Sequence, residues 1–373
     1  MADLITHFSN ITENRKPKGI RHKLINIIVI AICGVICGAD DWVMIEYFGN
    51  AKREWFETFL DLPHGIPSHD TFGKVFAMIN PKEFQAGFLD WVHEIADITS
   101  GQLIAIDGKT LRRSHDRSKG KEAIHLVSAW ASKNGVVLGQ VKVDEKSNEI
   151  TAIPELLKML DIHGCIVSID AIGTQKEIIS TILEEGGDYL LTVKQNQGTL
   201  YDQIDLAFGV DYKNEFKDAP YDYAKKVEKS HGRIETRECW VTSDPEYIDY
   251  IDPEGSWQKL SSLAIVKATR VIKGETSSQI RYFISSIKSD ADRMMLLIRN
   301  HWEVENKLHW SLDVTFNEDN SRVRTGHAPE NLALIRKMAL NLLRQNKTKK
   351  CGAKTKRMLC AIDTNFLLEI LNS

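Results

Sequence analysis

The sequence predicts an α/β fold: a mixed β-sheet flanked by helices, preceded by an all-helical N-terminal domain and carrying a β-rich insertion. Residues 1–98 place apolar residues at helical spacing and contain few strand signals. From Gly101 onward, short apolar strand patterns alternate with amphipathic helix patterns, as in a mixed sheet. Residues from about 200 to 288 break this alternation with short β-rich segments between polar loops.

The composition describes a chain that can bury a large core. The 373 residues are 43% hydrophobic, and this length favours two domains or one large domain with an appendage. The net charge of −3 means that any nucleic-acid surface must come from local clusters of Lys and Arg. The six cysteines form no CxxC pair, so we expect neither a zinc ribbon nor a disulfide framework but a reducing cytoplasm.

One N-terminal segment resembles a signal sequence or a membrane span. The apolar run Leu24–Gly38 is shorter than the roughly 20 residues that a spanning helix needs. It also leads directly into Asp40 and Asp41, and no small-residue cleavage site follows it. We therefore expect a buried core helix in a cytoplasmic protein that does not enter the membrane.

The catalytic region is expected to begin with strands, a hairpin and helices. The elements between Gly101 and residue 200 are, in order, a strand ending at Asp107, a hairpin at Asn134-Gly135, a helix beginning near Pro154, a strand ending at Asp170, a helix ending at Gly186-Gly187 and a strand over 188–196. After the β-rich insertion, a long helix is expected from about 290 to 312, followed by a mostly helical tail.

Two of the expected strands end in a carboxylate. LIAIDGKTLRRS reaches Asp107 after four apolar residues, and CIVSIDAIGTQ reaches Asp170 after a similar run. Open α/β sheets place their functional sites at the carboxyl ends of strands, so both residues are candidates for a site. The alternative for each is a helix cap or a turn residue.

A third carboxylate comes from the expected long helix. Its apolar stripe, at steps of three and four, consists of Met294, Ile298, His301, Glu305, Leu308 and Leu312. An ionised Glu305 on an apolar face needs a proton, a cationic partner or a metal. An ion pair with a core Arg or Lys is the alternative. Three carboxylates without cysteine form a hard oxygen site that suits Mg²⁺ or Mn²⁺, and paired ions of this kind serve phosphodiester chemistry.

Several motifs resemble the DDE transposases of bacterial insertion sequences, and in particular the H-repeat-associated group. They are PSHDTFGKVF, AIDGKTLRRS, IDAIGTQ, VKQNQG, SHGRIETR and RNHWEVENKLHWSLDVTFNED. The resemblance implies an RNase H-like catalytic domain over 99–345 with its insertion at about 200–288, a transposase-associated helical domain over 1–98 and a basic helical tail over 346–373. It also implies a catalytic, metal-binding triad of Asp107, Asp170 and Glu305.

The same resemblance implies the activity. Two Mg²⁺ or Mn²⁺ ions would support hydrolysis at the ends of a mobile element, followed by transfer of the new 3′-hydroxyl into target DNA by a homo-oligomer. An RNase H-like nuclease without strand transfer and a catalytically silent DNA-binding remnant are the alternatives. Related insertion-sequence transposases often carry Tyr, Arg and Lys where this chain has Ile298, His301 and Leu312, which leaves open how the DNA strand is gripped.

Basic and polar residues near these motifs are the candidates for DNA contact. They are Lys109, Arg112, Arg113, Lys194, Asn196, Arg233, Arg237 and His301. The alternatives are a solvated basic turn for the first three and ion pairs with Glu235 or Glu238 for Arg233 and Arg237. Nine further basic residues and no acid lie between Asn331 and Ile362, which suits contact with DNA phosphates or simply a solvated tail. Asp313, Glu318 and Asp319 are expected in a polar turn or near the metals.

Overall fold

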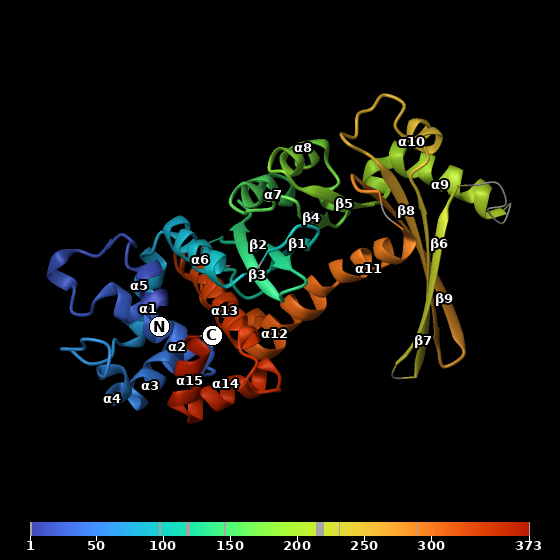
Figure 1. Ribbon diagram of the computed structural model, residues 1–373. Helices are drawn as coiled ribbons and strands as arrows, with labels where there is room; N and C mark the ends of the chain where they lie inside the picture. Colours follow the sequence, from blue (N-terminus) through green and yellow to red (C-terminus); the bar gives the residue numbers. More distant parts are fainter. Residues whose placement is uncertain are drawn as a thin grey trace. The chain divides into compact units, whose positions relative to one another are not determined.

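The computed structural model describes residues 2–96, 98–116, 120–144, 147–213, 220–230, 232–288 and 290–372. The chain forms two compact units. Figure 1 shows the ribbon of the chain, coloured by residue number from blue to red. The first unit comprises Met1–Ile98, Gly108–Lys146 and Glu305–Ser373, and the second comprises Thr99–Asp107 and Ser147–Val304.

The N-terminal part of the first unit is helical, as the sequence predicts. Its elements are α1 (Ala2–Phe8), a 3-10 turn (Pro17–Gly19), α2 (Leu24–Ile36), α3 (Trp42–Ala51), α4 (Arg53–Glu57), α5 (His69–Met78) and α6 (Pro81–Ile95). The side-chain oxygens of Asp41 and Ser68 accept hydrogen bonds from backbone amides in the first turns of α3 and α5, respectively. These caps fix where the two helices begin. Helix α2 is buried along most of its length, so the apolar run is a core helix. No helix in the described ranges is long and apolar enough to cross a bilayer.

The C-terminal helices of the first unit pack around α13. They are α12 (Trp310–Phe316), α13 (Ala328–Gln345), α14 (Ala353–Ile362) and α15 (Thr364–Leu371). Helix α13 contacts α2, α5 and α6 as well as strand β3, and it is buried on nearly all sides. Strands β2 (His125–Ala131) and β3 (Val136–Lys142) form the predicted antiparallel hairpin, in which Gly135 takes a positive φ of 66°.

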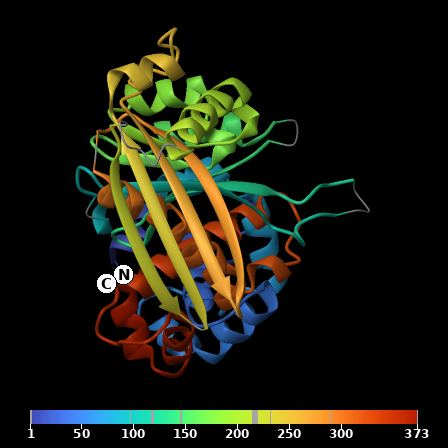
Figure 2. The same ribbon diagram turned by 90° about the vertical axis from the view of Figure 1, so that its right-hand side faces the viewer.

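The second unit contains a mixed sheet. Its strands are β1 (Leu103–Thr110), which runs on into the first unit, and β4 (Ile166–Ile169), β5 (Asp188–Val193), β6 (Asp222–Ser230), β7 (Arg233–Thr242), β8 (Ser262–Ile272) and β9 (Glu275–Ser285). Within this unit their spatial order is β1-β4-β5-β9-β8-β7-β6. The first three are parallel, whereas β9 to β6 continue the sheet as antiparallel strands, drawn side by side in Figure 2. The β-rich insertion is thus an extension of the sheet.

Helices cover both faces of this sheet. The helices are α7 (Glu149–Lys158), α8 (Lys176–Glu184), α9 (Gly198–Lys213), α10 (Pro245–Ile251) and α11 (Ala291–His301). One side of α11 packs into a single apolar cluster with side chains such as Leu103, Ile166 and Cys239, which all lie on one face of the sheet. On the opposite face, the ring of Phe208 from α9 lies 5.6 Å from the ring of Trp240. The predicted fold class, a mixed sheet flanked by helices with a helical N-terminal region, is confirmed.

The predicted basic patch of the C-terminal region is partly wrong. Arg336, Lys337, Lys356 and Arg357 are buried, so four of its nine cations belong to the interior. The Lys356 ammonium donates to the backbone carbonyl of Leu343, and Arg357 donates to that of Val35. These cations satisfy carbonyl oxygens inside the first unit and cannot meet DNA. The exposed cations of the patch are Lys347, Lys349, Lys350 and Lys354.

Lys337 gives this burial a measurable pH dependence. Burial lowers the pKa of its ammonium to about 8, and its Nζ donates to Oε1 of Gln140 at 2.6 Å. Because the folded state releases this proton at a lower pH than the unfolded state, folding becomes more favourable as pH rises through 8. Between pH 7 and 9 the free energy of unfolding of the wild type should rise by about 1 kcal/mol relative to Lys337→Met. Urea titrations at pH 7 and 9 measure the free energy of unfolding of both proteins. An equal change with pH in the wild type and in Lys337→Met would contradict the prediction.

Candidate functional site

Asp107 and Asp170 lie opposite each other where two parallel strands stop pairing. The register pairs Leu103 with Ile166 and Ile106 with Ile169, so the next step along both strands brings Asp107 opposite Asp170. Neighbouring strands lie about 4.8 Å apart. Strand β4 ends at Ile169, but β1 continues to Thr110, so the expectation that Asp107 is the last residue of its strand is corrected.

Both carboxylates lie on the face of the sheet that α11 covers. Side chains alternate between faces along a strand, so Asp107 shares the face of Leu103, and Asp170 shares that of Ile166. Leu103 and Ile166 pack against α11. The second unit therefore directs the two carboxylates toward the same helix.

His301, the last residue of α11, lies near both carboxylates. Its Nδ1 forms a 2.9 Å hydrogen bond with Oγ of the buried Ser168, two residues before Asp170 on the same face of β4. Burial lowers the pKa of the His301 imidazole, although the charges of Asp107 and Asp170 favour its protonated form. The structure thus brings three of the predicted site residues together.

Lys194 neutralises Asp170. Its Nζ lies 3.0 and 3.1 Å from the two carboxylate oxygens of Asp170. Burial opposes ionisation of Asp170, but the amide of Ala171 and the Lys194 ammonium outweigh it and lower the pKa of this carboxyl. Asn196 donates its side-chain amide to the carbonyl of Ala171, so it fixes the loop beside Asp170.

A cleft opens beside this pair. Its volume is about 650 Å³, and Asp170, Lys194, Asn196, Tyr201 and Arg281 are among the residues that line it. All of its lining residues belong to the second unit. The cleft gives an extended ligand access to Asp170.

Glu305 does not lie on a buried helix face, and this expectation was wrong. The predicted long helix is interrupted: α11 ends at His301, a π-helical segment runs over Val304–His309, and α12 follows. A π-helical turn accommodates an extra residue and rotates the side chains that follow it. Val304 and Leu308 are buried, whereas Glu305 is exposed. The boundary between the units lies here: Glu305 belongs to the first unit, whereas His301, four residues earlier, belongs to the second.

Lys109 is not an exposed DNA contact but the centre of a partly buried ion cluster in the first unit. Its ammonium bonds to Asp313, lies 2.8 Å from Oε2 of Glu318 and lies 3.7 Å from Oδ1 of Asp319. Burial would raise the pKa of Glu318, but Lys109, Lys337 and Arg336 outweigh it and lower this pKa. Glu318 and Asp319 lie in a 3-10 turn (Glu318–Asn320), as the sequence predicts, whereas Asp313 lies in helix α12, so the predicted turn is wrong for that residue.

The other predicted DNA contacts have different surroundings. Arg112 and Arg113 are exposed, and Nε of Arg112 lies 3.1 Å from Oδ2 of Asp319. Arg233 and Arg237 in β7 both pair with Glu235, at 3.2 and 2.8 Å, which is the ion pairing expected as the alternative. His231, in the same motif, lies outside the described residues.

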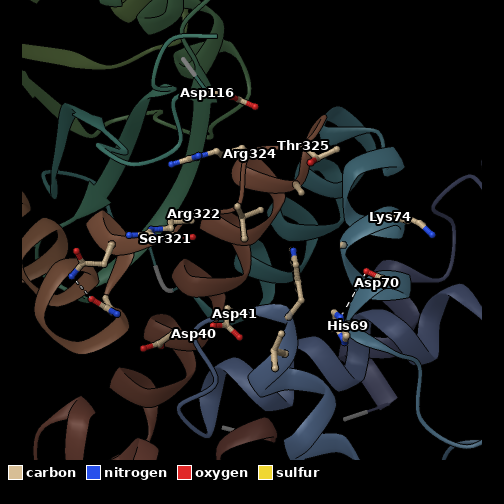
Figure 3. A pocket seen from close by; sticks show the side chains of 17 residues that line it. Asp40, Asp41, His69, Asp70, Lys74, Asp116, Ser321, Arg322, Arg324 and Thr325 are labelled. Carbon is tan, nitrogen blue, oxygen red and sulfur yellow. Dashed lines mark hydrogen bonds and ion pairs between the residues drawn. The ribbon is translucent and has the colours of Figure 1, made fainter. Parts of the chain in front are cut away.

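The first unit has a larger cleft that sequence reasoning missed. It has a volume of about 790 Å³ and is shown in Figure 3. Its lining comes from segments distant in sequence: Asp41 immediately precedes α3, Asp70 and Lys74 lie in α5, and Arg322 and Arg324 lie in the loop before α13. Acidic and basic side chains are mixed along its walls, so it lacks the charge of one sign that would indicate a ligand class.

Some acidic residues of the second unit have the donor type that hard metal ions prefer. In the described part of the chain, no group of three or more His, Cys, Asp and Glu residues is arranged to hold an ion. Asp107 and Asp170 nevertheless offer two register-matched oxygen ligands, the type that Mg²⁺ and Mn²⁺ prefer. Lys194 already supplies a positive charge to one of them. The pair therefore fits a divalent ion that has at least one further ligand.

Comparison with known proteins identifies the family. Residues 98–342 match the family described as "Transposase DDE domain", and residues 5–92 match the one described as "DDE_Tnp_1-associated". The chain belongs to the DDE transposase family. The resemblance read from the sequence motifs is confirmed.

Relatives of similar length support this assignment. The chain is 45% identical to "Putative transposase YncI" of Escherichia coli O157:H7, over 100% of this chain and 95% of the relative. It is 42% identical to "H repeat-associated putative transposase YhhI" of Escherichia coli (strain K12), over 100% of this chain and 98% of the relative. Among solved structures, the piggyBac transposase in a synaptic complex with hairpin DNA aligns with a TM-score of 0.41 and 12% identity, over 100% of this chain and 79% of that one.

The nearly buried position of Lys109 can be tested by its effect on stability. Lys109→Met leaves the fully buried Glu318 carboxylate without its nearest cation, so the free energy of unfolding should fall by about 3–5 kcal/mol. Arg112→Met is the matched control, because its side chain is 80% exposed and its ion pair contributes at most about 1 kcal/mol. Adding Glu318→Gln to Lys109→Met should restore part of the loss. Urea unfolding measures the free energy of unfolding of these three variants. If Lys109→Met and Arg112→Met lowered it equally, Lys109 would instead be a surface residue available for DNA contact.

Proposed function

We propose that this protein is a metal-dependent DNA transposase that cuts the ends of a mobile element and joins them to target DNA. The observation that carries the proposal is the register of β1 and β4, which brings Asp107 opposite Asp170 on the face toward His301. The membership of the DDE transposase family supports the same chemistry. DNA is the proposed partner, a homo-oligomer on DNA the proposed assembly and the cytoplasm the proposed location.

We assign the metal ligands to Asp107, Asp170 and Glu305. The first two have the oxygen donors and the alignment that Mg²⁺ or Mn²⁺ requires. Glu305 is exposed, so its carboxylate is accessible to an ion, and it follows His301 by four residues in the sequence. Two divalent ions bound there would activate the attacking oxygen and stabilise the leaving oxygen at the phosphorus.

The neighbouring residues would hold and orient the DNA strand. Lys194 would move from Asp170 to a phosphate oxygen when the carboxylate binds an ion, because its side chain is more than half exposed and can move. His301 is fixed by Ser168, so its Nε2 can orient a water or phosphate oxygen beside the carboxylates. Asn196 would keep the loop after β5 in place through its bond to Ala171.

The proposed reaction has two steps of the same kind. In the first, a water oxygen attacks the phosphorus at the element end, the bond from phosphorus to the 3′-oxygen breaks, and a 3′-hydroxyl leaves after taking up a proton. In the second, this 3′-hydroxyl loses its proton and attacks a target phosphorus, and the target's own 3′-oxygen leaves. Neither step needs a covalent protein–DNA intermediate.

Two alternatives make different predictions for this site. A nuclease of the same fold would perform the first step only, so a pre-cut end with a free 3′-hydroxyl would not be joined to target DNA. A silent DNA-binding remnant would bind duplex but cut nothing, and Mn²⁺ would not raise its melting temperature, because only binding to the folded state stabilises it.

The triad can be tested by strand cleavage. Asp107→Asn, Asp170→Asn and Glu305→Gln should each lower the single-turnover cleavage rate on the order of 10³-fold, since each removes several kcal/mol of transition-state stabilisation. The substrate is a duplex made from the DNA that flanks the coding sequence on either side, with Mg²⁺. Glu303→Gln is the matched control, because it removes an acid two residues from Glu305 and should cleave normally. A triad variant that cleaves at the wild-type rate removes that residue from the site.

A further inference from the structure

The extended strands β6 to β9 carry a row of cations on the face that α11 covers. The register pairs Ala224 with Cys239 and Cys239 with Val266, and these three pack against α11. Side chains alternate, so Lys226, Arg233, Arg237 and Arg270 lie on the same face, farther toward the ends of the strands. Arg299 of α11 joins them through Glu228. We call these five residues, Lys226, Arg233, Arg237, Arg270 and Arg299, the arginine face.

A buried carboxylate organises this face. Glu235 is 4% exposed, and three arginines converge on it: Arg237 at 2.8 Å, Arg233 at 3.2 Å and Arg270 at 3.4 Å. A single carboxylate cannot neutralise three guanidinium groups. These distances belong to Nη2 of Arg233 and Nε of Arg270, and a guanidinium has five N–H donors in all.

A second carboxylate extends the row toward α11. Oε2 of Glu228 accepts from Arg237 at 2.6 Å and lies 3.1 Å from Nη1 of Arg299, and Oε1 lies 3.7 Å from Nζ of Lys226. Arg237 bridges the two carboxylates and is nearly buried, whereas Lys226 and Arg299 are about half exposed. The outer cations are therefore held in place and still presented to solvent.

The arginine face leads to the cleft beside Asp170. Gln279 and Arg281 lie on the same face of β9 as Phe283 of the α11 cluster, and both line that cleft. Across the sheet, Arg233 of β7 is in register with Ile272 of β8, which is in register with Glu275 of β9. Arg281 and Glu275 are six residues apart along β9, which is about 20 Å at 3.4 Å per residue. A DNA strand has about six phosphates over that length.

The opposite face of the same strands is different in kind. It exposes Val227, Ile234 and Ile280, together with the lysines Lys225 and Lys229. Lysine is a flexible point charge, whereas a guanidinium held by a carboxylate presents a fixed fork that matches phosphate oxygens. The two faces therefore differ in how their charge is ordered, although both carry cations.

We infer that the arginine face binds the phosphate backbone of duplex DNA, guides it to the cleft beside Asp170, and depends on Glu235 to hold its arginines in position. This assignment rests on the proposed function, because it takes DNA as the partner. In it, Arg233, Arg270, Arg299 and Lys226 contact phosphates, whereas Arg237 is a positioning residue.

The test is the salt dependence of binding to a duplex of arbitrary sequence, in EDTA, with the full-length protein. Replacing Arg233 and Arg270 together by Gln should reduce the slope of log K against log salt by about 2 and weaken binding roughly 10-fold or more near 0.1 M salt. The matched control replaces Lys225 and Lys229 by Gln, which removes the same charge from the opposite face and should leave the slope unchanged. Equal effects of the two pairs would overturn the inference.

Glu235→Gln tests the organising role through the sign of its effect. It removes a negative charge, so a purely electrostatic surface would bind DNA more tightly, whereas loss of the arginine arrangement predicts weaker binding. Thermal unfolding of each variant shows whether it is folded, and the exposed pair Arg233 and Arg270 keeps the test valid if Glu235→Gln does not fold. Tighter or unchanged binding by folded Glu235→Gln would overturn the organising role.

This experiment also separates the inference from the proposed function. Without divalent ions no strand is cut, so the binding measurement does not depend on the triad. If the slopes change as expected but no cleavage is ever found, the arginine face stands and the transposase activity fails. If cleavage occurs and the slopes do not change, the reverse holds.

Discussion

The in-register parallel pairing of β1 with β4 is the constraint on which the candidate site depends. A slip of one residue would turn either aspartate to the other face of the sheet, away from α11. The register is held because Leu103 and Ile166 must both pack into the cluster under α11, while Ile104 and Val167 are buried on the other face. The apolar core therefore specifies the positions of the two carboxylates, although neither carboxylate contributes to the core.

Charge inside this molecule serves two different purposes. In the first unit, Lys337 and Lys356 are buried and Lys109 is nearly so, and these cations are paired with carboxylates, an amide or carbonyl oxygens. Such groups are costly to desolvate, and removing one partner leaves the other uncompensated, so they specify one arrangement of the helices around α13. In the second unit, Asp170 with Lys194 and the arginine face remain partly exposed, where a phosphate can exchange with a protein partner. The distinction between structural and binding charge thus follows burial.

The sequence predicted what depends on local pattern. The N-terminal helices, the hairpin at Asn134-Gly135 and the strands that lead to Asp107 and Asp170 follow from apolar periodicity and turn residues. Glu305 was misplaced because the prediction extrapolated one helical period across a segment that becomes π-helical. Lys109 was misassigned because its partners lie 204 and 209 residues away, which no local pattern can report. The buried cations of α13 and α14 were missed for the same reason, and the triad itself stays a prediction.

The central claim is that Asp107 and Asp170 share a divalent ion. The most direct measurement is anomalous diffraction from crystals soaked in Mn²⁺. The account predicts a peak about 2.1 Å from a carboxylate oxygen of each aspartate, with Lys194 displaced from Asp170 and an oxygen of Glu305 beside the same ion or a second one 3.5–4 Å away. Manganese bound elsewhere, with Lys194 still paired to Asp170 in fully soaked crystals, would contradict it.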